Sequence, residues 1–589
     1  MTLRAIARLG LAIGMLGALE GCVAQTSIGK AFTLNWEDDK GDSIRKLEAK
    51  LRSVPIPAAT DVAIGVTDKG IVGVPLGGGS PWTFEHVLDG RPDVGGSVVV
   101  GLGGEELFAL QASTGKLLWK RPASNVTLRG VGDDGTVTVV VFESKAGQGS
   151  TLLAVSRDGE VLRQQPTQRK LGRPAVVGNV AFIPWSGQYV SAYDISNGEE
   201  VARVTLRHQT SLAFITNKTM FFGESTLTRF DEQIGAASFD RASTLKLPEK
   251  NVIGGARWMA PAAEARPLKA GANDKARVVA RAAARGEPIG FEEGRFATIY
   301  FRFAHGFDSL GNLKWVHTHP SDILGGASYK GGVALCDADG KITFLESETG
   351  LEAGQIELGQ PIDSCVLQAD QLSRAASGAK SKPLIDQVRA AMEYPSADMV
   401  AAQKFLLGEI SKGDDAAVTK LLLDLYVNPK TSPVLLPEIE KRITERRSGV
   451  EAMLEALEHR YDYLADVLRG PPVGPIADAL GAIGDKRGAP ALAKQLNDPN
   501  TSSDDLRRAA AALETLATPA EAKELETFFA LNRFTTIDAA IENALVSVAK
   551  ALLRVGTDHG KDLVVRTAKD PLVTSSLQNR LPRWCRTCW

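Results

Sequence analysis

The residues of this chain that are best able to do chemistry are few and lie far apart in the sequence. His317 and His319 flank Thr318, so on a β-strand both imidazoles would face one side, as two ligands of a metal ion do. Asp337-Ala-Asp339-Gly340 has the spacing with which a calcium-binding loop opens. Neither group has the additional ligands that such a site needs. We therefore expect the histidines to lie at the surface or between neighbouring sheets, and the acidic segment to form a turn between two strands.

The chain has five cysteines. Apart from Cys22 they are Cys336, Cys365, Cys585 and Cys588, an even number that permits two disulfides in an oxidising compartment. Cys336 and Cys365 lie near corresponding ends of neighbouring predicted strands, where a disulfide would clamp the end of the β-rich part to its beginning. The sequence does not fix the distance between their Cα atoms, so this pairing stays open.

The last five residues contain Cys585-Arg-Thr-Cys588, with Trp584 and Trp589 on either side. Such a pair is redox-active where a helix N-terminus lowers the pKa of one thiol. No β-α-β pattern surrounds it here, and a zinc site would need two more ligands. The order of preference is a disulfide within the tail, then a reactive pair, then a metal site.

Other catalytic patterns are missing from the sequence. It has no Ser–His–Asp constellation, no phosphate-cradling loop and no paired-carboxylate motif. The net charge is −2, so no basic field would recruit nucleic acid. We therefore expect a protein that is not an enzyme, holds no cofactor or metal, and does not bind nucleic acid.

The N-terminus carries the pattern of an export signal. An apolar run over residues 9–19 follows two arginines; it is too short to span a bilayer and sits where the apolar region of a signal peptide belongs. Leu19-Glu20-Gly21-Cys22 resembles the lipobox of bacterial lipoproteins, which implies lipidation of Cys22 and removal of residues 1–21. Glu20 departs from that pattern. An ordinary secretory signal with an incidental cysteine is the alternative.

A lipid on Cys22 would tie the rest of the chain to a membrane surface. Two or three acyl chains give stable anchoring, where one chain would be marginal. Val23 follows the cysteine, and by resemblance to lipoprotein sorting in Gram-negative bacteria this favours the outer membrane, with the protein facing the periplasm. Residues 22–56 would then be a lipidated tether and spacer, with a short helix over residues 42–51.

The chain after the tether has two unlike halves. Residues 57–370 are rich in Gly, Val, Thr and aromatic residues in short runs broken by turns, a pattern that predicts β-strands. Residues 384–589 are rich in Ala, Leu, Glu, Lys and Arg with apolar spacings of three and four, which predicts α-helices. Residues 371–383, small and polar, form the linker.

The β half repeats one unit: a strand, a tight turn with glycine, and a second strand. The turn glycines are Gly79, Gly115, Gly159, Gly198, Gly235, Gly311 and Gly350. Their spacing of about 40 residues suits a four-stranded propeller blade, with glycine in the turn between the third and fourth strands. The interval from Gly235 to Gly311 is about twice as long as the others. An insertion at about residues 261–287 explains it and gives seven blades, with eight as the alternative. Residues 362–367 are expected to pair with residues 62–66 and close the ring.

The Ala-x-Asp-x-x-Thr-Gly-x-x-Leu-Trp theme of this unit, best matched by residues 109–119, resembles the pyrroloquinoline-quinone-type (PQQ-like) propeller repeat. Trp82, Trp119 and Trp315 fit the packing between blades in that family. Quinone-dependent dehydrogenases of this kind hold Ca²⁺ on acidic and amide ligands and stack the quinone on aromatic side chains. The chain has neither their adjacent cysteine pair nor their aspartate constellation. A quinoprotein-like enzyme or a small-molecule sensor using the propeller channel is therefore the alternative function.

As a whole, the β half and its lipobox are more similar to the propeller lipoproteins of the outer-membrane β-barrel assembly machinery, which are scaffolds without a cofactor. That resemblance implies a membrane-anchored, non-catalytic scaffold for protein partners, with a role in outer-membrane protein assembly. Those lipoproteins have no helical half, so this chain departs from them after residue 370.

Residues 475–499 resemble a short HEAT-like repeat, in which two helices are joined by a Gly-Asp turn. Gly484 would end the first helix, Asp485 would turn the chain, and Pro490 would sit near the start of the second helix. Predicted helices at 503–516 and 519–529 form the next pair. The expected fold class is thus a PQQ-like β-propeller followed by a HEAT-like α-solenoid over residues 384–589, whose extended surface holds partners. A plain helical bundle is the alternative.

Overall fold

The computed structural model describes residues 31–581, with gaps. The gaps are residues 36–39, 56, 148, 207–208, 217–218, 224–225, 230–242, 247–295, 309–311, 330, 371, 373, 375–379, 381, 459–468 and 535–537. The signal sequence with Cys22, the predicted insertion at about 261–287, and the Cys585–Cys588 pair therefore lie outside the described residues.

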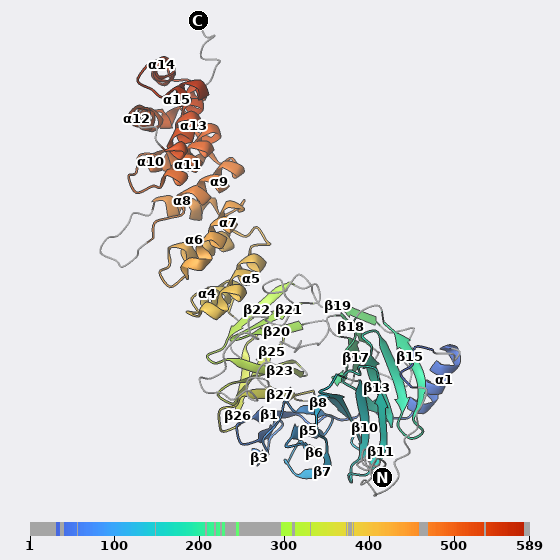
Figure 1. Cartoon of the computed structure of the whole chain (residues 1–589). Helices are drawn as coiled ribbons and strands as arrows, with labels where there is room; N and C mark the ends of the chain where they lie inside the picture. Colours follow the sequence, from blue (N-terminus) through green and yellow to red (C-terminus); the bar gives the residue numbers. More distant parts are fainter. Residues whose placement is uncertain are drawn as a thin grey trace, which may run out of the picture.

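The β half folds into a propeller of antiparallel sheets, which fills the lower part of Figure 1. The first three sheets have four strands each. The first consists of β27 (Ser364–Gln368), β1 (Val62–Val66), β2 (Ile71–Pro75) and β3 (Trp82–Phe84). The second consists of β4 (Asp93–Gly95), β5 (Val98–Gly103), β6 (Glu106–Gln111) and β7 (Leu117–Pro122). The third consists of β8 (Val126–Asp133), β9 (Val137–Ser144), β10 (Ser150–Ser156) and β11 (Val161–Thr167).

Four more sheets follow in chain order. The fourth consists of β12 (Ala175–Val177), β13 (Val180–Trp185), β14 (Tyr189–Asp194) and β15 (Glu199–Thr205). The fifth consists of β16 (Leu212–Thr216), β17 (Thr219–Gly223), β18 (Thr226–Arg229) and β19 (Ser243–Lys246). The sixth has three described strands, β20 (Phe296–Tyr300), β21 (Phe303–Phe307) and β22 (Leu313–Thr318). The seventh consists of β23 (Ile323–Tyr329), β24 (Gly332–Asp337), β25 (Lys341–Glu346) and β26 (Glu352–Glu357).

The ring closes as the sequence predicts. β27, from the end of the β half, pairs antiparallel with β1 from its beginning, with Val366 opposite Ile64. The first sheet is therefore built from both ends of the propeller, with β27 as its first strand and β1 enclosed between β27 and β2. Apolar clusters fill the space between neighbouring sheets, as where Ile64 of the first sheet packs with Phe108 of the second.

The turn glycines lie where the repeat predicts them, between the third and fourth strands of their sheets. The described ones, Gly79, Gly115, Gly159, Gly198 and Gly350, all have positive φ. Gly235 and Gly311 are outside the described residues. Gly311 falls between β21 and β22, so the three strands of the sixth sheet correspond to the second, third and fourth strands of the others.

A second constraint on these glycines comes from the tryptophans of the repeat. Trp82 of the first sheet lies against Gly115 in the turn of the second sheet, where a Cβ atom would collide with the indole. Trp315 of the sixth sheet meets Gly350 of the seventh in the same way, and its Nε1 donates to the carbonyl of Ser347 at 2.9 Å. Each of these tryptophans thus packs on the turn of the next sheet, and the predicted packing between blades is confirmed.

The helical half stacks in two layers, visible as two columns of helices in Figure 1. One layer contains α4 (Leu384–Met392), α6 (Ala416–Val427), α8 (Val450–Glu458), α10 (Ala489–Gln495), α12 (Ala522–Asn532) and α14 (Asp558–Thr567). The other contains α5 (Val400–Ile410), α7 (Leu436–Thr444), α9 (Val473–Ile483), α11 (Ser503–Leu516) and α13 (Ala539–Val555), with α15 (Ser575–Arg580) against α13. Short 3-10 turns are η4 (Ala397–Met399), η5 (Pro433–Leu435), η6 (Lys486–Gly488) and η7 (Pro519–Glu521).

The repeat predicted over residues 475–499 has the expected local structure. Gly484 ends α9 with φ of 79°, and the side chain of Asp485 accepts from the backbone N–H of Arg487. Pro490 occupies the first turn of α10. Small side chains such as Ala512 of α11, which faces Gly481 of α9, let neighbouring helices approach closely.

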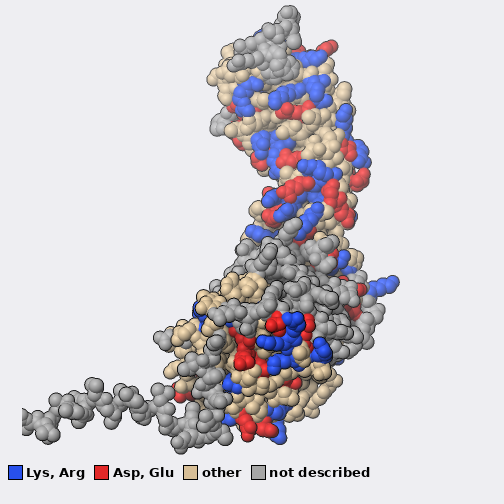
Figure 2. Space-filling model, turned by 90° about the vertical axis from the view of Figure 1, so that its right-hand side faces the viewer, with Lys and Arg blue, Asp and Glu red and all other residues tan. Residues whose placement is uncertain are grey.

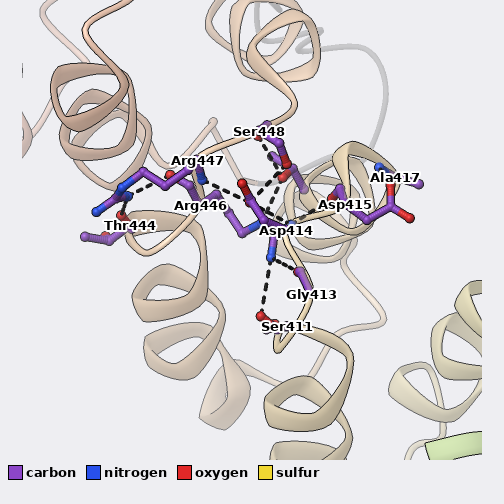
Figure 3. A network of polar contacts seen from close by, with 10 residues as sticks. Ser411, Gly413, Asp414, Asp415, Ala417, Thr444, Arg446, Arg447 and Ser448 are labelled. Atoms are coloured by element: carbon purple, nitrogen blue, oxygen red, sulfur yellow. Dashed lines mark hydrogen bonds and ion pairs between the residues drawn. The ribbon is translucent and has the colours of Figure 1, made fainter. Parts of the chain in front are cut away.

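The surface and the loops of the stack show two further features. Lys, Arg, Asp and Glu side chains are interspersed along it, without a large area of one sign on the face in Figure 2. At its base, the buried Arg446 joins the α5–α6 turn to the α7–α8 turn (Figure 3). Its guanidinium donates to the carbonyls of Gly413 and Asp415 at 2.7 and 2.8 Å and to the Thr419 hydroxyl at 3.0 Å.

Before the propeller, α1 (Lys40–Leu51) matches the helix predicted at 42–51 and packs on the fourth sheet. Within the part of the chain that the structure describes, no helix is long and apolar enough to cross a membrane.

Candidate interaction site at the junction of propeller and solenoid

The propeller and the solenoid share one apolar core. Phe303 and Phe307 of β21 are fully buried in the cluster that also contains Val388 and Met392 of α4. Full burial of a phenylalanine side chain is worth about 1.5–3 kcal/mol relative to exposure, and Tyr394 and Phe405 of the solenoid supply part of that burial here. A shared core of this kind resists relative motion of the two modules. Two modules joined only by a linker would move more freely.

Aromatic rings make the contact specific. Tyr394, just after α4, meets Phe303 edge to face with ring centroids 5.6 Å apart. Phe405 of α5 lies 6.3 Å from Phe307 and 5.8 Å from the imidazole of His305, again edge to face. These are the geometries that aromatic pairs prefer. The alternating residues Phe303, His305 and Phe307 therefore present one face of β21 to the first helices of the solenoid.

The outer edge of the sixth sheet is also covered. Gln387 of α4 accepts a hydrogen bond from the backbone N–H of Val316 at 2.7 Å. β22 is the last strand of its sheet, so this N–H has no strand partner to bond. The side chain of Gln387 thus bonds the N–H group of Val316, which at an exposed strand edge would bond to water or to another chain.

Arg302 ties three separate segments together. Its Nε donates to Asp322, in the loop before β23, at 2.8 Å, and its Nη1 donates to the Tyr394 hydroxyl at 2.8 Å. The Tyr394 hydroxyl in turn donates to the carbonyl of His319 at 3.4 Å. Tyr394 therefore bonds the turn between β20 and β21 and the residue after β22 to the solenoid, and Arg302 links this contact to the loop before β23.

The two predicted histidines lie behind this contact, between the sixth and seventh sheets. His319 Nε2 lies 2.9 Å from Asp337 Oδ2, and His317 Nε2 lies 3.2 Å from His319 Nδ1. An ionised Asp337 only accepts, so His319 carries a proton on Nε2, and its Nδ1 faces Nε2 of His317. The other oxygen of Asp337 accepts from the N–H groups of Asp339 and Lys341, which makes the predicted turn.

Burial sets the protonation of this chain of groups. Burial, together with the neighbouring His319, lowers the pKa of His317 to about 4. Burial lowers the pKa of His305 to about 3. Burial alone would raise the pKa of Asp337, but hydrogen bonds from His319 and from the turn lower it overall. At neutral pH, His317 and His305 are therefore neutral and Asp337 is ionised.

These histidines position the junction. Among the described residues, no group of three or more His, Cys, Asp or Glu side chains is arranged to hold a metal ion. Hydrogen bonds join Asp337 to His319 and His319 to His317. The backbone carbonyl of His319 also accepts a hydrogen bond from the Tyr394 hydroxyl. Their arrangement holds the docking edge of the sixth and seventh sheets in place.

The four cysteines after Cys22 fall in two places. Cys336 of β24 and Cys365 of β27 form a disulfide, with Cα atoms 6.4 Å apart. It links the seventh sheet to the first at the closure of the ring. Cys585 and Cys588 lie outside the described residues.

Four residues of the junction were not predicted from the sequence: Arg302, Gln387, Tyr394 and Phe405. A signal for the junction was present in Phe303-Ala-His305-Gly-Phe307, where large aromatic rings alternate with the smallest side chains. Such a strand has a face that must be covered. What covers it could not be read from the sequence.

Comparison with known proteins identifies the propeller. The family model described as "Outer membrane protein assembly factor BamB" matches residues 69–290. The propeller is of the PQQ-like, BamB-like type. The match covers less than half of the chain and does not include the solenoid. No curated protein matches the chain.

The solved structures that match align with about half of this chain. BamB from Moraxella catarrhalis is 17% identical over 52% of this chain and 85% of its own, with a TM-score of 0.30. The computationally designed Ika8 protein is 13% identical over 52% and 91%, with a TM-score of 0.30. Sqt1 from Saccharomyces cerevisiae is 11% identical over 56% and 90%, with a TM-score of 0.32. At these scores the likeness does not extend to a role.

Proposed function

We propose that this protein is a membrane-anchored envelope lipoprotein that acts as a non-catalytic scaffold, with its propeller and solenoid holding protein partners together. The junction is the observation that carries the proposal. The core shared by β21, α4 and α5 keeps two repeat-built modules in one relative orientation. Two broad surfaces that are fixed in this way suit the simultaneous binding of one large partner or two smaller ones.

A role in outer-membrane protein assembly is the finer part of the proposal. It is supported by the BamB-like propeller over residues 69–290 and by the lipobox-like Leu19-Glu20-Gly21-Cys22. The lipid on Cys22 would place the scaffold on the periplasmic face of the outer membrane. Fatty-acid labelling of the wild type and of Cys22→Ala tests this anchor: label in the wild type alone supports it.

Exposed apolar side chains near the ends of several solenoid helices are candidate contacts for a partner. Large apolar side chains are exposed after helices of the α4–α14 layer: Val434 follows α6, Leu531 and Phe534 lie at the end of α12, and Leu572 follows α14. Leu531 is 69% exposed and Leu572 78%. Exposed leucine and aromatic side chains among charged neighbours are typical anchors of a protein partner.

The experiment is affinity capture of the full chain from solubilised envelopes. We expect the wild type to recover a defined set of outer-membrane assembly proteins, and Leu531→Asp with Leu572→Asp to recover much less at an unchanged Tm. Leu162→Asp, on the propeller strand β11, is the matched control, because Leu162 is also exposed. Repeated recovery of no partner would count against a scaffold, and a quinone absorbance in the purified protein would favour the enzyme or sensor instead.

A further inference from the structure

The segment before α1 is anchored in the propeller through one aromatic side chain. Phe32 is 1% exposed and belongs to the apolar cluster of the third and fourth sheets. Its ring stacks on Tyr193 of β14, with centroids 5.7 Å apart, and meets the indole of Trp185 edge to face at 6.1 Å. More than 150 residues separate Phe32 from these partners, so the contact is tertiary and not a local turn.

The backbone around Phe32 is held by a buried ion pair. Glu200 and Arg203 of β15 are each 4% exposed at their side chains, and Arg203 Nε donates to Glu200 at 2.6 Å. Glu200 also accepts from the backbone N–H of Phe32 at 3.2 Å, and Arg203 donates to the carbonyl of Thr33 at 2.6 Å. A buried ion pair needs such additional hydrogen bonds to offset its desolvation.

The backbone of Phe32 has an unusual conformation that the pocket around its side chain explains. Its φ is 60°, in the left-handed region that bulky residues rarely adopt. Such a conformation persists only where the surroundings over-determine it. The aromatic pocket and the Glu200–Arg203 pair supply those surroundings.

A second attachment follows at α1. Leu47 and Leu51 are buried in an apolar cluster with residues of the fourth sheet. Lys50 forms an ion pair with Asp194 of β14, with Nζ and Oδ2 2.5 Å apart. The chain is therefore fixed to the fourth sheet at Phe32 and again at the end of α1.

This double attachment changes how far a lipid on Cys22 can lie from each part of the propeller. The ten residues from Cys22 to Phe32 span at most about 33–36 Å when fully extended, and about 16–19 Å as a random coil. Without the attachment, the 34 residues from Cys22 to Ile56 would span about 110–120 Å. A domain of about 310 residues has a radius of gyration of about 20 Å, hence a diameter of about 50 Å. The free tether would let any face meet the membrane, whereas the attached one would not.

The charge of α1 also suits contact with a membrane surface. Residues 40–52 contain five basic and two acidic side chains, a net charge of +3. Arg45, Lys46 and Arg52 are exposed. Figure 2 looks onto the side of the propeller that carries α1 in Figure 1, and Lys and Arg side chains gather there beside acidic ones. Basic side chains next to a lipid anchor are attracted by anionic phospholipid headgroups.

We propose that the outer edge of the fourth sheet, with α1, is the face that the propeller turns toward an anionic phospholipid surface, and that Phe32 is the positioning residue that fixes this orientation. The inference rests on the proposed lipid anchor at Cys22. Through the junction, the same contact would also set how the solenoid stands relative to the membrane.

The test uses the full chain, purified in its lipidated form and reconstituted into phosphatidylcholine vesicles with or without phosphatidylglycerol. A fluorescent probe is placed at Ala49→Cys on α1 or, as the matched control, at Gln355→Cys on β26 of the seventh sheet, across the ring. Both positions are exposed. Cys585→Ser and Cys588→Ser in the background leave a single reactive thiol. Quenching by lipids with a nitroxide headgroup then reports which side lies near the bilayer.

We expect headgroup quenching at Ala49→Cys to exceed that at Gln355→Cys at least threefold, with a larger ratio on vesicles that contain phosphatidylglycerol. Phe32→Ala should bring the two signals closer together, because the tether then lengthens to the second attachment at α1. Leu34→Ala, at an exposed neighbour of the pocket, should leave them apart. Tm and near-UV spectra check that each variant is folded.

Equal quenching at both positions in the lipidated protein would overturn this orientation and leave the lipid anchor intact. A mature protein without fatty acid would overturn the anchor and, with it, the orientation. A ratio that is the same on both kinds of vesicle would overturn the part played by the basic residues of α1.

Discussion

Cys336 and Cys365 are joined across the closure of the propeller. Cys336 lies on β24 of the seventh sheet and Cys365 on β27 of the first, and both are fully buried. The first sheet already closes the ring through the hydrogen bonds between β27 and β1. The disulfide adds a covalent link between that sheet and its neighbour, so the two ends of the propeller are held twice.

Removing this link should destabilise the propeller without changing its strand pairing. The disulfide closes a segment of 29 residues, which in the chain-entropy model corresponds to about 3–4 kcal/mol. We expect Cys336→Ala with Cys365→Ala to lower the Tm of the propeller transition in calorimetry by several degrees. Cys585→Ser with Cys588→Ser is the control and should leave that transition in place. An unchanged transition in the first variant would show that strand pairing alone closes the ring.

The closure of the ring could be predicted from the sequence because each repeat is marked by residues at fixed positions. Glycines such as Gly115 and Gly350 sit at turns that need positive φ, and tryptophans such as Trp82 and Trp315 pack on the turn that follows, so spacing alone gives the blades. The same holds for Gly484 and Pro490 in the solenoid, which mark one helix end and the next helix start.

The junction and the Phe32 pocket could not be predicted in that way. Phe405 has the apolar spacing of any helix in a stack, Tyr394 follows the end of α4, and nothing local tells that their partners are on β21. Phe32 stands alone before the propeller, and its pocket is built from β13, β14 and β15. Both contacts depend on the arrangement of elements that are distant in sequence, which local patterns do not encode.

The hydroxyl of Tyr394 should matter for the coupling of the two modules. Tyr394→Phe removes the acceptor of Arg302 and the donor to His319 while keeping the ring on Phe303. We expect faster proteolytic cleavage within residues 371–383 and a broader distribution of sizes in small-angle scattering. Tyr426→Phe, which removes a hydroxyl bonded to Glu440 within the solenoid, is the control. Equal cleavage rates in both variants would argue that the apolar core alone fixes the junction.

Deleting the ring of Phe405 should weaken the junction more than deleting a hydroxyl. Phe405 is only partly buried, so the loss in Phe405→Ala should be about 2–3 kcal/mol, below the 3–5 kcal/mol of a fully buried phenylalanine. We expect separate calorimetric transitions for propeller and solenoid in place of overlapping ones. Phe534→Ala, at an exposed ring of the solenoid, should change neither transition.

The buried histidines predict a loss of stability in mild acid. The pKa of His317 is lowered from 6.5 to about 4, so between these values the unfolded chain binds a proton that the native protein does not. Stability is therefore full well above pH 6.5 and falls as the pH drops toward 4, by about 1.5 kcal/mol between pH 6.5 and pH 5.

His317→Gln should remove that part of the pH dependence of Tm, although it lowers stability at pH 7 through the weakened bond to His319. His559→Gln is the matched control, because His559 is exposed and should leave the slope as it is in the wild type. A slope in His317→Gln equal to that of the wild type would show that His317 is not neutral in the native protein.

Arg446 is the residue at which the contacts between neighbouring repeats of the solenoid can be tested (Figure 3). Its guanidinium reaches Gly413, Asp415 and Thr419 from one planar group and also pairs with Asp414 at 3.2 Å. A lysine ammonium is a point charge on a flexible stem and cannot make these bonds together. Because the residue is buried, the carbonyls it leaves would lack partners, at a cost of about 2–4 kcal/mol.

Arg446→Lys should therefore loosen the base of the stack and leave its far end unchanged, since stacked repeats are stabilised mainly by their neighbours. We expect hydrogen exchange of backbone amides to become at least tenfold faster in α6 and α7 and to stay the same in α13. Arg507→Lys, at an exposed arginine paired with Asp504 within α11, should change exchange little because surface ion pairs contribute about 0–1 kcal/mol. Uniformly faster exchange from α4 to α15 would mean that the solenoid opens as one unit, and wild-type rates in α6 and α7 would mean that the guanidinium contacts are dispensable.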